Sequence, residues 1–593
     1  MTQHYSLVGT DPEIVADIDR FESTLADYLD GKVDEDVFRV FRLSQGIYGQ
    51  RQGGHNQMVR AKVPYGSIQP DQLDMLGHVV DTYSRGWGHI TTRQNLQFHF
   101  VQLEQIPDVL RALGSVGMTT REACGDTVRN VAGCHLAGAC PHEELDISAW
   151  AEATHQYFVR NPLGQRLPRK FKVNFSGCAT DCGQAMFNDV GVIATSRTLD
   201  DGTAEQGFRV YIAGGLGANP HPALALEDFT AREDLMPTIE SLLRVFDRTG
   251  NRDNKLRARM KWLVDTIGLD EIRRQVFHTR RLLLASATYP GGIPAVVEKM
   301  GDAPAGRAPG ADVTVMGQGT PVALTSRDPF DRWKAANVIR GVANNTVSAI
   351  ASCELGDVTS DQFRALASAQ REFGADVRLT NRQNFVFRGL TEAQLRPLYD
   401  RLSALGMAQA GAELSRDVVS CPGADTCNLA VTQSRGLAKA IGEALTAEGL
   451  DEVGGVRINI SGCTNSCGQH HTADIGLFGA ERRVGDRSAP GYQLLLGGYV
   501  GDEQIEFGDK VLRLPAKAVP EATVRVIRRF AGERTGGETF RKWFDRSGGA
   551  KALAAELRDL DAFPDHDLQP EFYIDFDEAS PYSAEVGASE CAT

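Results

Sequence analysis

The sequence predicts an α+β protein made of two homologous halves related by a pseudo-two-fold axis. Three pairs of segments recur in the same order and at nearly the same separation along the 593 residues. They are TTRQNLQFH at 91–99 with LTNRQNFVFR at 379–388, GCHLAGAC with SCPGADTC, and FSGCATDC with ISGCTNSC. Collinear matches of this kind indicate an internal duplication, and each half mixes helical and strand periodicities.

The first regular elements of a half are a helix and then a strand. The segment DQLDMLGHVVDTY has one apolar helical face, formed by Leu73, Leu76, Val79 and Val80. The next segment, HITTRQNLQFHFV, alternates as a strand does. Its apolar face comprises Ile90, Thr92, Leu96, Phe98 and Phe100, and its polar face comprises Thr91, Arg93, Asn95, Gln97 and His99. A solvated strand face would explain this pattern, but the repeat keeps polar residues at Arg378, Thr380, Arg382 and Arg388, which favours a ligand.

A second strand, LPRKFKVNFSGC, runs directly into a cysteine. Its polar face would carry Lys170, Lys172 and Asn174. Arg60 in MVRAKVPYG and Arg129 in DTVRN add two further cations to the same half. Each cation alone is an ordinary surface charge, so their meaning depends on whether the fold brings them together.

Composition fits a globular protein of more than one domain, with 42% apolar and 24% charged residues. No apolar run approaches the length of a membrane span, and no secretory signal is recognisable, so a membrane partner is not expected. The net charge of −14 argues against a nucleic-acid partner. Cysteines in cofactor-like spacings favour a reduced, cytoplasmic protein over a disulfide scaffold.

The cysteines form two quartets with one pattern, C-x5-C followed by C-x3-C. The second-half quartet is Cys421, Cys427, Cys463 and Cys467, and the first-half quartet is Cys134, Cys140, Cys178 and Cys182. Four thiolates from two loops suit a [4Fe-4S] cluster. Structural zinc is the alternative, although its cysteine pairs are usually closer together. Gly462 and Gly468 flank the last pair, which lets the backbone approach a bulky inorganic group.

This arrangement, with SGCTNSCG around its second part, resembles the sirohaem and [4Fe-4S] signature of the sulfite and nitrite reductase family, over about residues 45–545. The resemblance implies a sirohaem whose iron is bridged to the cluster by Cys467. It implies that the sirohaem pocket includes Thr91, Arg93, Gln97, His99, Asn465 and Cys467. It also implies that the substrate anion is held by a clamp of four cations, Arg60, Arg129, Lys170 and Lys172.

On this resemblance each half consists of a ferredoxin-like α/β module and a larger α+β module that binds cofactor. The expected order is an N-terminal helical extension (1–45), a ferredoxin-like module (46–120), a sirohaem and Fe–S-type module (121–284), a linker (285–325), a second ferredoxin-like module (326–408), a second sirohaem and Fe–S-type module (409–548) and an acidic tail (549–593). The linker is rich in Gly, Pro and Ala. The tail is expected to be solvated because it is rich in acids.

The first-half quartet is complete, whereas single-site members of this family lack cysteines there. Either this quartet binds a second [4Fe-4S] cluster, or the evolutionary loss of its cysteines is incomplete. The clamp of a second reactive site would come from the second half, where Arg416 and Arg457 match two of the four cations but Gly455 and Ile350 replace the others. One catalytic sirohaem is therefore predicted.

Three smaller features carry further expectations. His89 stands where the repeat has Arg378, and histidine is a weaker ligand for a cofactor carboxylate. Tyr48 and Cys124 lie in motifs that adjoin the sirohaem in some ferredoxin-type relatives, so a covalent Tyr–Cys link is one interpretation and an ordinary buried thiol the other. The basic run RDNKLRARMK at 252–261 could dock an acidic ferredoxin or form a solvated helix face.

The resemblance implies six-electron reduction of sulfite to sulfide, with reduction of nitrite to ammonia as the alternative on the same cofactors. No flavin or nicotinamide domain is recognisable, so electrons are expected from a separate ferredoxin or flavoprotein. Two other hypotheses remain: an oxygenase like precorrin-3B synthase, and a non-enzymatic cluster carrier. A carrier would not need four converging cations.

Overall fold

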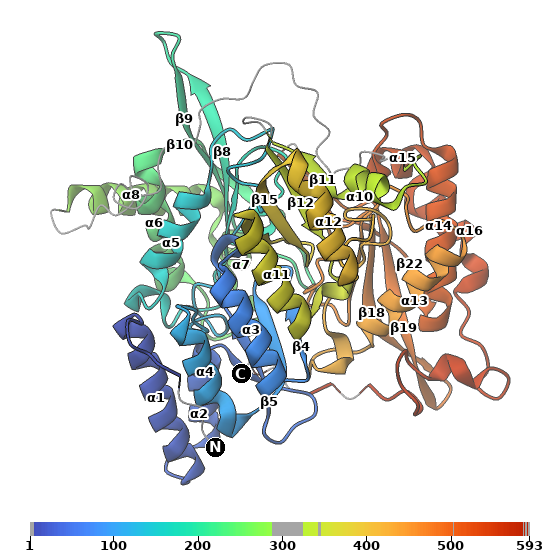
Figure 1. Ribbon diagram of the computed structural model, residues 1–593, viewed down its shortest axis with the longest axis horizontal. Helices are drawn as coiled ribbons and strands as arrows, with labels where there is room; N and C mark the ends of the chain where they lie inside the picture. The colour runs from blue at the N-terminus through green and yellow to red at the C-terminus, as the bar shows by residue number, and fades with distance from the viewer. Residues whose placement is uncertain are drawn as a thin grey trace.

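The computed structural model describes residues 5–286, 324–341, 346–501, 503–584, 586–587 and 590. Within them, elements repeat in the same order in two halves, which confirms the predicted duplication. Each half contributes two five-stranded sheets with helices packed on them. In Figure 1 the two antiparallel sheets and their helices lie at the centre, and the two larger mixed sheets flank them.

The central sheets exchange their edge strands. Their orders are β1-β2-β5-β4-β13 and β11-β12-β15-β14-β3, so each half lends one strand to the other. Val358 lies opposite Gly88 in one exchange, and Ile68 lies opposite Val377 in the other. The strands are β1 (Ile47–Gly49), β2 (Asn56–Ala61), β3 (Ser67–Ile68), β4 (Trp87–Ile90), β5 (Leu96–Gln102), β11 (Val338–Arg340), β12 (Thr346–Ala351), β13 (Asp357–Thr359), β14 (Asp376–Leu379) and β15 (Phe385–Thr391).

Helices α3 and α11 lie side by side over these sheets (Figure 1). Gly77 permits the close approach, because a Cβ there would lie 3.1 Å from both Arg364 and the Ser360 carbonyl. The predicted helical face of α3 is confirmed, since all four of its apolar residues are buried. The helices of the central modules are α3 (Pro70–Tyr83), α4 (Ile106–Ser115), α10 (Pro329–Asn337), α11 (Ser360–Phe373) and α12 (Leu395–Ala404).

The larger sheets have the orders β10-β9-β8-β7-β6 and β16-β17-β18-β19-β22. In each sheet the first three strands in chain order run parallel to one another; they are β6, β7 and β8 in the first half and β16, β17 and β18 in the second. The strands are β6 (Ala132–Gly133), β7 (Val173–Ser176), β8 (Val190–Thr198), β9 (Ala204–Ile212), β10 (Leu224–Ala231), β16 (Val419–Ser420), β17 (Ile458–Ser461), β18 (Ile475–Val484), β19 (Arg487–Leu496) and β22 (Asp509–Pro515). A small ribbon consists of β20 (Tyr499–Gly501) and β21 (Gln504–Glu506).

Helices on the larger sheets bury their apolar faces in two further cores. The first-half set is α5 (Ser148–Phe158), α6 (Leu235–Thr249), α7 (Met260–Ile267) and α8 (Leu269–Ala285). The second-half set is α13 (Ser434–Ala447), α14 (Val519–Glu533), α15 (Phe540–Arg546) and α16 (Gly549–Glu556). Helices α1 (Pro12–Leu29) and α2 (Glu35–Ser44) pack beside α4 and β1.

The C-terminal tail contacts the protein at several points, although most of its described residues after Arg558 are exposed or half-buried. Asp575 accepts a hydrogen bond from the Gln433 amide at 2.9 Å, at the start of α13. Tyr582 donates to the Val431 carbonyl at 3.0 Å, and Glu590 forms an ion pair with Arg42 of α2. The tail therefore crosses the second-half cysteine loop and reaches the N-terminal helices.

Two other expectations need correction or fall outside the described residues. The segment 89–101 is not one strand, because a turn at residues 91–95 separates β4 from β5. The predicted linker 285–325 lies outside the described residues except at its ends. Among the described helices, none is long and apolar enough to cross a membrane.

Candidate functional site

Both cysteine quartets lie at the carboxyl ends of neighbouring parallel strands. In the second half, Cys421 follows β16 and Cys463 follows β17. The two strands are paired, with Ser420 opposite Ile460, so their cysteine loops emerge side by side. Ligand sites in sheets of this kind favour that edge.

The four second-half thiols lie close enough to affect one another. Burial and the nearby Cys467 thiol raise the pKa of Cys427 to about 12. The Gly462 amide donates to the Cys421 sulfur at 3.2 Å, a contact that suits a thiolate. Among the described residues, no group of three or more His, Cys, Asp or Glu is compact enough to hold a single metal ion. A cluster fits this spacing better than zinc, because each cysteine then binds a different iron.

The loop that carries Cys467 is held from both sides. Asn459 donates to the Gly468 carbonyl at 2.8 Å, and the Gly468 amide donates to Ser461 at 3.0 Å. Any Cβ at residue 468 would lie 2.0 Å from the Ile460 carbonyl, so only glycine fits. Cys467 and Asn465 are exposed on this loop, which leaves a sulfur open to a neighbouring group.

The turn between β4 and β5 brings polar side chains to the cysteine loop. The Thr92 hydroxyl donates to the Cys467 carbonyl at 2.9 Å. Thr91 instead accepts from the Asn95 and Arg93 amides within the turn, so its hydroxyl oxygen organises the backbone. The alternating pattern had assigned Thr92 to the core face, whereas the turn brings its hydroxyl to the cysteine loop.

Arg93 is half-buried among neutral oxygens. Its guanidinium donates to the Asn174 side chain at 2.7 Å and to the Asn130 carbonyl at 2.7 Å. Burial lowers the pKa of Arg93 to about 9, and the cations Arg129 and Arg60 contribute to the lowering. A site with this much positive charge in one place favours an anion.

The His99 ring is buried without hydrogen-bond partners among the described residues. The side chain is 2% exposed, and neither ring nitrogen has a hydrogen-bond partner among the described residues. Burial, followed by nearby His89, holds the pKa of His99 well below its usual range, so the ring is neutral. A buried polar atom without a partner is costly, and a cofactor with polar substituents would supply one. These residues therefore fit a sirohaem beside Cys467.

His89 does not contribute to this pocket as expected. Its Nδ1 lies 3.0 Å from an Asp357 carboxylate oxygen, and its Nε2 lies 3.1 Å from the Gln383 amide nitrogen. Both ring nitrogens are thus engaged at the exchanged edge strand β13, where His89 joins the two halves.

Of the four predicted clamp cations, Arg60, Arg129 and Lys172 lie near Arg93, and Lys170 lies near Lys172. Arg60 on β2 faces Gln97, whose side-chain oxygen accepts from Nε at 3.2 Å in the orientation that suits both groups. Arg129 donates to the Ala123 carbonyl at 3.1 Å. Burial, and then the nearby cations Arg93, Arg259 and Lys170, hold the pKa of Lys172 well below its usual range.

A buried ion pair beside the clamp was missed by the sequence analysis. Arg259 donates two hydrogen bonds from Nη2 to Asp189, at 2.8 and 2.9 Å, and the Asp189 side chain is fully buried. Because Arg259 occupies this carboxylate, the Lys172 ammonium forms no ion pair within the described residues. Asp189 could have been found from the duplication, since FNDVG matches TADIG around Asp474.

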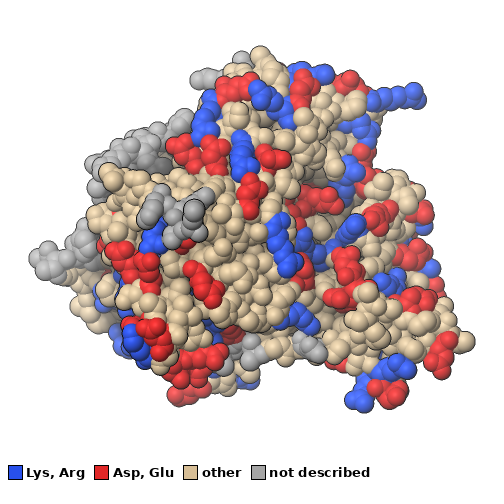
Figure 2. All heavy atoms as spheres, turned by 60° about the horizontal axis from the view of Figure 1, so that its bottom comes forward, with Lys and Arg blue, Asp and Glu red and all other residues tan. Residues whose placement is uncertain are grey.

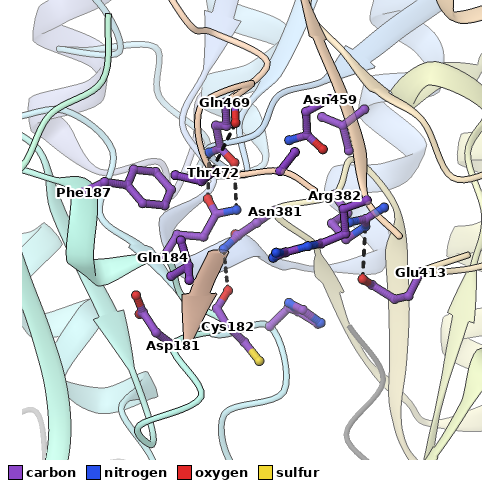
Figure 3. A pocket seen from close by; sticks show the side chains of 15 residues that line it. Asp181, Cys182, Gln184, Phe187, Asn381, Arg382, Glu413, Asn459, Gln469 and Thr472 are labelled. Atoms are coloured by element: carbon purple, nitrogen blue, oxygen red, sulfur yellow. Dashed lines mark hydrogen bonds and ion pairs between the residues drawn. The ribbon is translucent and has the colours of Figure 1, made fainter. Parts of the chain in front are cut away.

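The equivalent cations of the second half are neutralised by carboxylates. Arg382, the counterpart of Arg93, pairs with Glu413 at 3.1 Å and with Asp417 at 3.2 Å. Arg416 pairs with Asp451 at 2.8 Å, and Arg457 pairs with Asp474 at 3.1 Å. Figure 3 shows Arg382 turned toward Glu413 at the edge of a cavity of about 70 Å³ that also reaches Cys182.

The basic run 252–261 is exposed over most of its first part and turned inward in its second part. Lys255 pairs with Asp126 at 2.7 Å, Arg259 holds Asp189, and Lys261 is buried against the Leu216 carbonyl at 3.1 Å. Elsewhere on the surface, the face in Figure 2 intermingles basic and acidic side chains.

Tyr48 and Cys124 meet at Arg60. The Arg60 guanidinium lies 5.5 Å from the Tyr48 ring centre, and its Nη1 lies 3.7 Å from the Cys124 sulfur. Both side chains therefore border the clamp, and Cys124 is fully buried.

Comparisons with known families place these features in context. Residues 124–282 and 411–558 match the family described as "Nitrite and sulphite reductase 4Fe-4S domain". Residues 48–116 and 343–405 match the family described as "Nitrite/Sulfite reductase ferredoxin-like half domain". Each family is therefore matched once in each half.

Individual relatives span most of the chain. It is 30% identical over 494 residues to a ferredoxin–nitrite reductase of Synechococcus elongatus, covering 81% of this chain and 86% of that protein. It is 29% identical to an assimilatory ferredoxin-dependent nitrite reductase of Haloferax mediterranei (91% of each) and 27% identical to a ferredoxin sulfite reductase of Mycobacterium tuberculosis (85% and 87%). The solved structure of the Mycobacterium tuberculosis NirA protein superposes with a TM-score of 0.72 at 26% identity, covering 88% of this chain and 92% of that one.

Proposed function

This chain belongs to the nitrite and sulfite reductase family, and from that premise we propose that it reduces sulfite to sulfide. As a member of this family it is an oxidoreductase that uses sirohaem and a [4Fe-4S] cluster. The second-half quartet would hold the cluster, and the sirohaem would lie beside Cys467, His99 and the turn before β5. When bound, these groups supply an iron centre that receives electrons one at a time.

The observation that carries the proposal is the charge of the clamp. Within the described residues neither Arg60 nor the Lys172 ammonium forms an ion pair, and Asp189 is held by Arg259. The uncompensated charge of Arg60, joined by that of Lys172 once the anion draws a proton to it, favours a dianion over a monoanion, because the attraction grows with the charge of the ligand. Near neutral pH sulfite is present as both hydrogensulfite and the dianion, whereas nitrite is always a monoanion, so the clamp favours sulfite.

Lys172 would also hold a proton at the substrate. Its low pKa means that the free site binds this proton weakly. An anion against Nζ favours the ammonium form, so substrate binding would draw a proton into the site. Hydrogensulfite takes up six electrons and six protons to give hydrosulfide and three waters, and in this proposal Lys172 would donate protons to the departing oxygens.

The electrons would come from an external donor, for which a ferredoxin is the first choice because several relatives are named for that partner. Nitrite reduction is the second candidate function, since two of the most similar relatives are named nitrite reductases. A cytoplasmic location is proposed from the unpaired cysteines, which suit a reducing compartment.

The test is steady-state oxidation of reduced viologen by the holoprotein, with sulfite and with nitrite as alternative acceptors. We expect a higher kcat/KM for sulfite, and a higher value for nitrite would overturn the choice of substrate. Lys172→Ala should lose most turnover while retaining the sirohaem absorption. A cluster carrier would turn over neither anion, and its properties would not respond to this substitution.

A further inference from the structure

The first-half quartet occupies the same structural position as the second-half quartet. Cys134 follows β6 and Cys178 follows β7, and these strands are parallel neighbours, with Gly133 opposite Phe175. The Cys134 amide donates to the Phe175 carbonyl at 2.9 Å, and the Cys421 amide donates to the Ile460 carbonyl at 3.2 Å. The strands thus deliver both sets of thiols in the same way.

The loop after Cys178 is built like the loop after Cys463. Asn174 donates to the Gly183 carbonyl at 2.7 Å, and the Gly183 amide donates to Ser176 at 3.0 Å, which reproduces the contacts of Asn459, Gly468 and Ser461. Any Cβ at residue 183 would lie 1.9 Å from the Phe175 carbonyl, as close as at residue 468. The asparagine, glycine and serine contacts that shape one cluster loop are therefore also present in the other.

Even the strained positions of the loop are shared. Asp181 and Ser466 have φ values of 56° and 58°, and Gln184 and Gln469 have φ values of 60° and 63°. Residues other than glycine avoid this region unless the surrounding structure requires it. Gln184 and Gln469 also meet across the pseudo-two-fold axis through a hydrogen bond of 2.7 Å, visible in Figure 3. A loop that had lost its ligand would not need to keep this conformation.

The first-half thiols converge in a closed space. Cys134 and Cys140 are each 3% exposed and Cys178 is 6% exposed. Cys140 hydrogen-bonds to Cys178, and Cys182 hydrogen-bonds to Cys134, so two pairs of thiols from two loops face one another. No thiol of this set is exposed as Cys467 is. The arrangement suits a group bound by all four sulfurs with no open side.

The neighbouring space is closed to a second sirohaem. Arg388, the counterpart of His99, hydrogen-bonds to the Ala137 carbonyl and pairs with Asp376 at 3.0 Å. Arg382 is neutralised by Glu413, which also lines the cavity beside Cys182. A cavity of about 70 Å³ with a buried carboxylate in its wall does not fit a tetrapyrrole that carries several carboxylates of its own.

We propose that the first-half quartet, Cys134, Cys140, Cys178 and Cys182, binds a second [4Fe-4S] cluster that has no sirohaem beside it. Binding separates the two thiol pairs and gives each sulfur its own iron. The proposal concerns a metal site that the sulfite reduction proposed above does not require, so the two can fail independently.

The test is a count of iron and sulfide in the holoprotein purified without oxygen. Two clusters and one sirohaem give about nine irons and about eight acid-labile sulfides per chain. The double variant Cys134→Ser/Cys178→Ser should lose about four of each while retaining the sirohaem absorption. The matched control is Cys353→Ser, a buried thiol outside both quartets, which should keep the full count.

Three results would overturn the second cluster. One is a wild-type count of about five irons and four sulfides. Another is a zinc content of about one per chain in the wild type that disappears in the double variant, because this zinc would be bound by the first-half quartet. The third is two disulfides in that quartet, detected as missing thiols after denaturation. The wild-type count decides the matter even if the variant fails to fold, and it does so whether the protein reduces sulfite, nitrite or neither.

Discussion

Replacing Arg259 with methionine should weaken sulfite binding although Arg259 is assigned no contact with the substrate. The substitution leaves the Asp189 carboxylate buried without its partner. Asp189 already accepts from the Lys172 backbone amide at 3.1 Å, so the nearest cation to replace Arg259 is the Lys172 ammonium. We expect Lys172 to turn to Asp189 and to leave the clamp.

The size of the effect follows from the interaction that is lost. A hydrogen bond to a charged group is worth about 1.5–3 kcal/mol, which corresponds to about a 10- to 150-fold rise in KM for sulfite. Breaking a buried ion pair also costs about 3–5 kcal/mol of stability. The double variant Asp189→Asn/Arg259→Met removes both charges, so it should recover most of the stability and bring KM within about threefold of the wild type.

The assay is sulfite-dependent oxidation of reduced viologen, with variants matched for sirohaem content, together with the midpoint of urea unfolding. The reasoning is refuted if Arg259→Met leaves KM within about twofold of the wild type. It is refuted equally if the double variant is as impaired as the single one, because the defect would then come from the loss of Arg259 itself.

Three further predictions use the same preparations. In the wild type, kcat/KM for sulfite should fall as pH rises through the lowered pKa of Lys172, because only the ammonium form binds the anion. The Lys172→Arg variant should show this fall at higher pH, which a pH–rate profile would measure. Glu413→Gln, on the second-half clamp, should leave sulfite turnover unchanged, and a large loss would show that this half also binds substrate. Burial raises the pKa of Asp575 to about 6, so its contribution to stability falls as pH rises through about 6. The wild-type thermal midpoint should therefore fall relative to that of Asp575→Asn between about pH 4 and pH 7.

The duplication and both cysteine patterns were visible in the sequence because each depends on local spacing that occurs twice, whereas the clamp residues were expected from the family resemblance. The strand exchange was not, since β3 and β13 are only two and three residues long and carry no periodicity. Thr92 was assigned to the core face because a tight turn interrupts the alternation on which the prediction rested.

Contacts between distant residues explain the remaining errors. Arg259 and Asp189 are far apart in the sequence, so a basic run gave no sign that two of its cations point inward. The acidity of the tail suggested solvation, but Asp575 is buried at the start of α13, where a carboxylate meets the partial positive charge of a helix N-terminus.

The exchange of β3 and β13 makes the chain equivalent to a domain-swapped dimer whose subunits have been fused. Each half supplies an edge that the other lacks, as identical partners do in an isologous interface. Neither antiparallel sheet can be completed until residues far away in the sequence have arrived, which places the pairing late in folding. The proposed cofactor pocket would draw on strands of one half and cysteines of the other, so it would form only at that step, and cofactor loading would follow it.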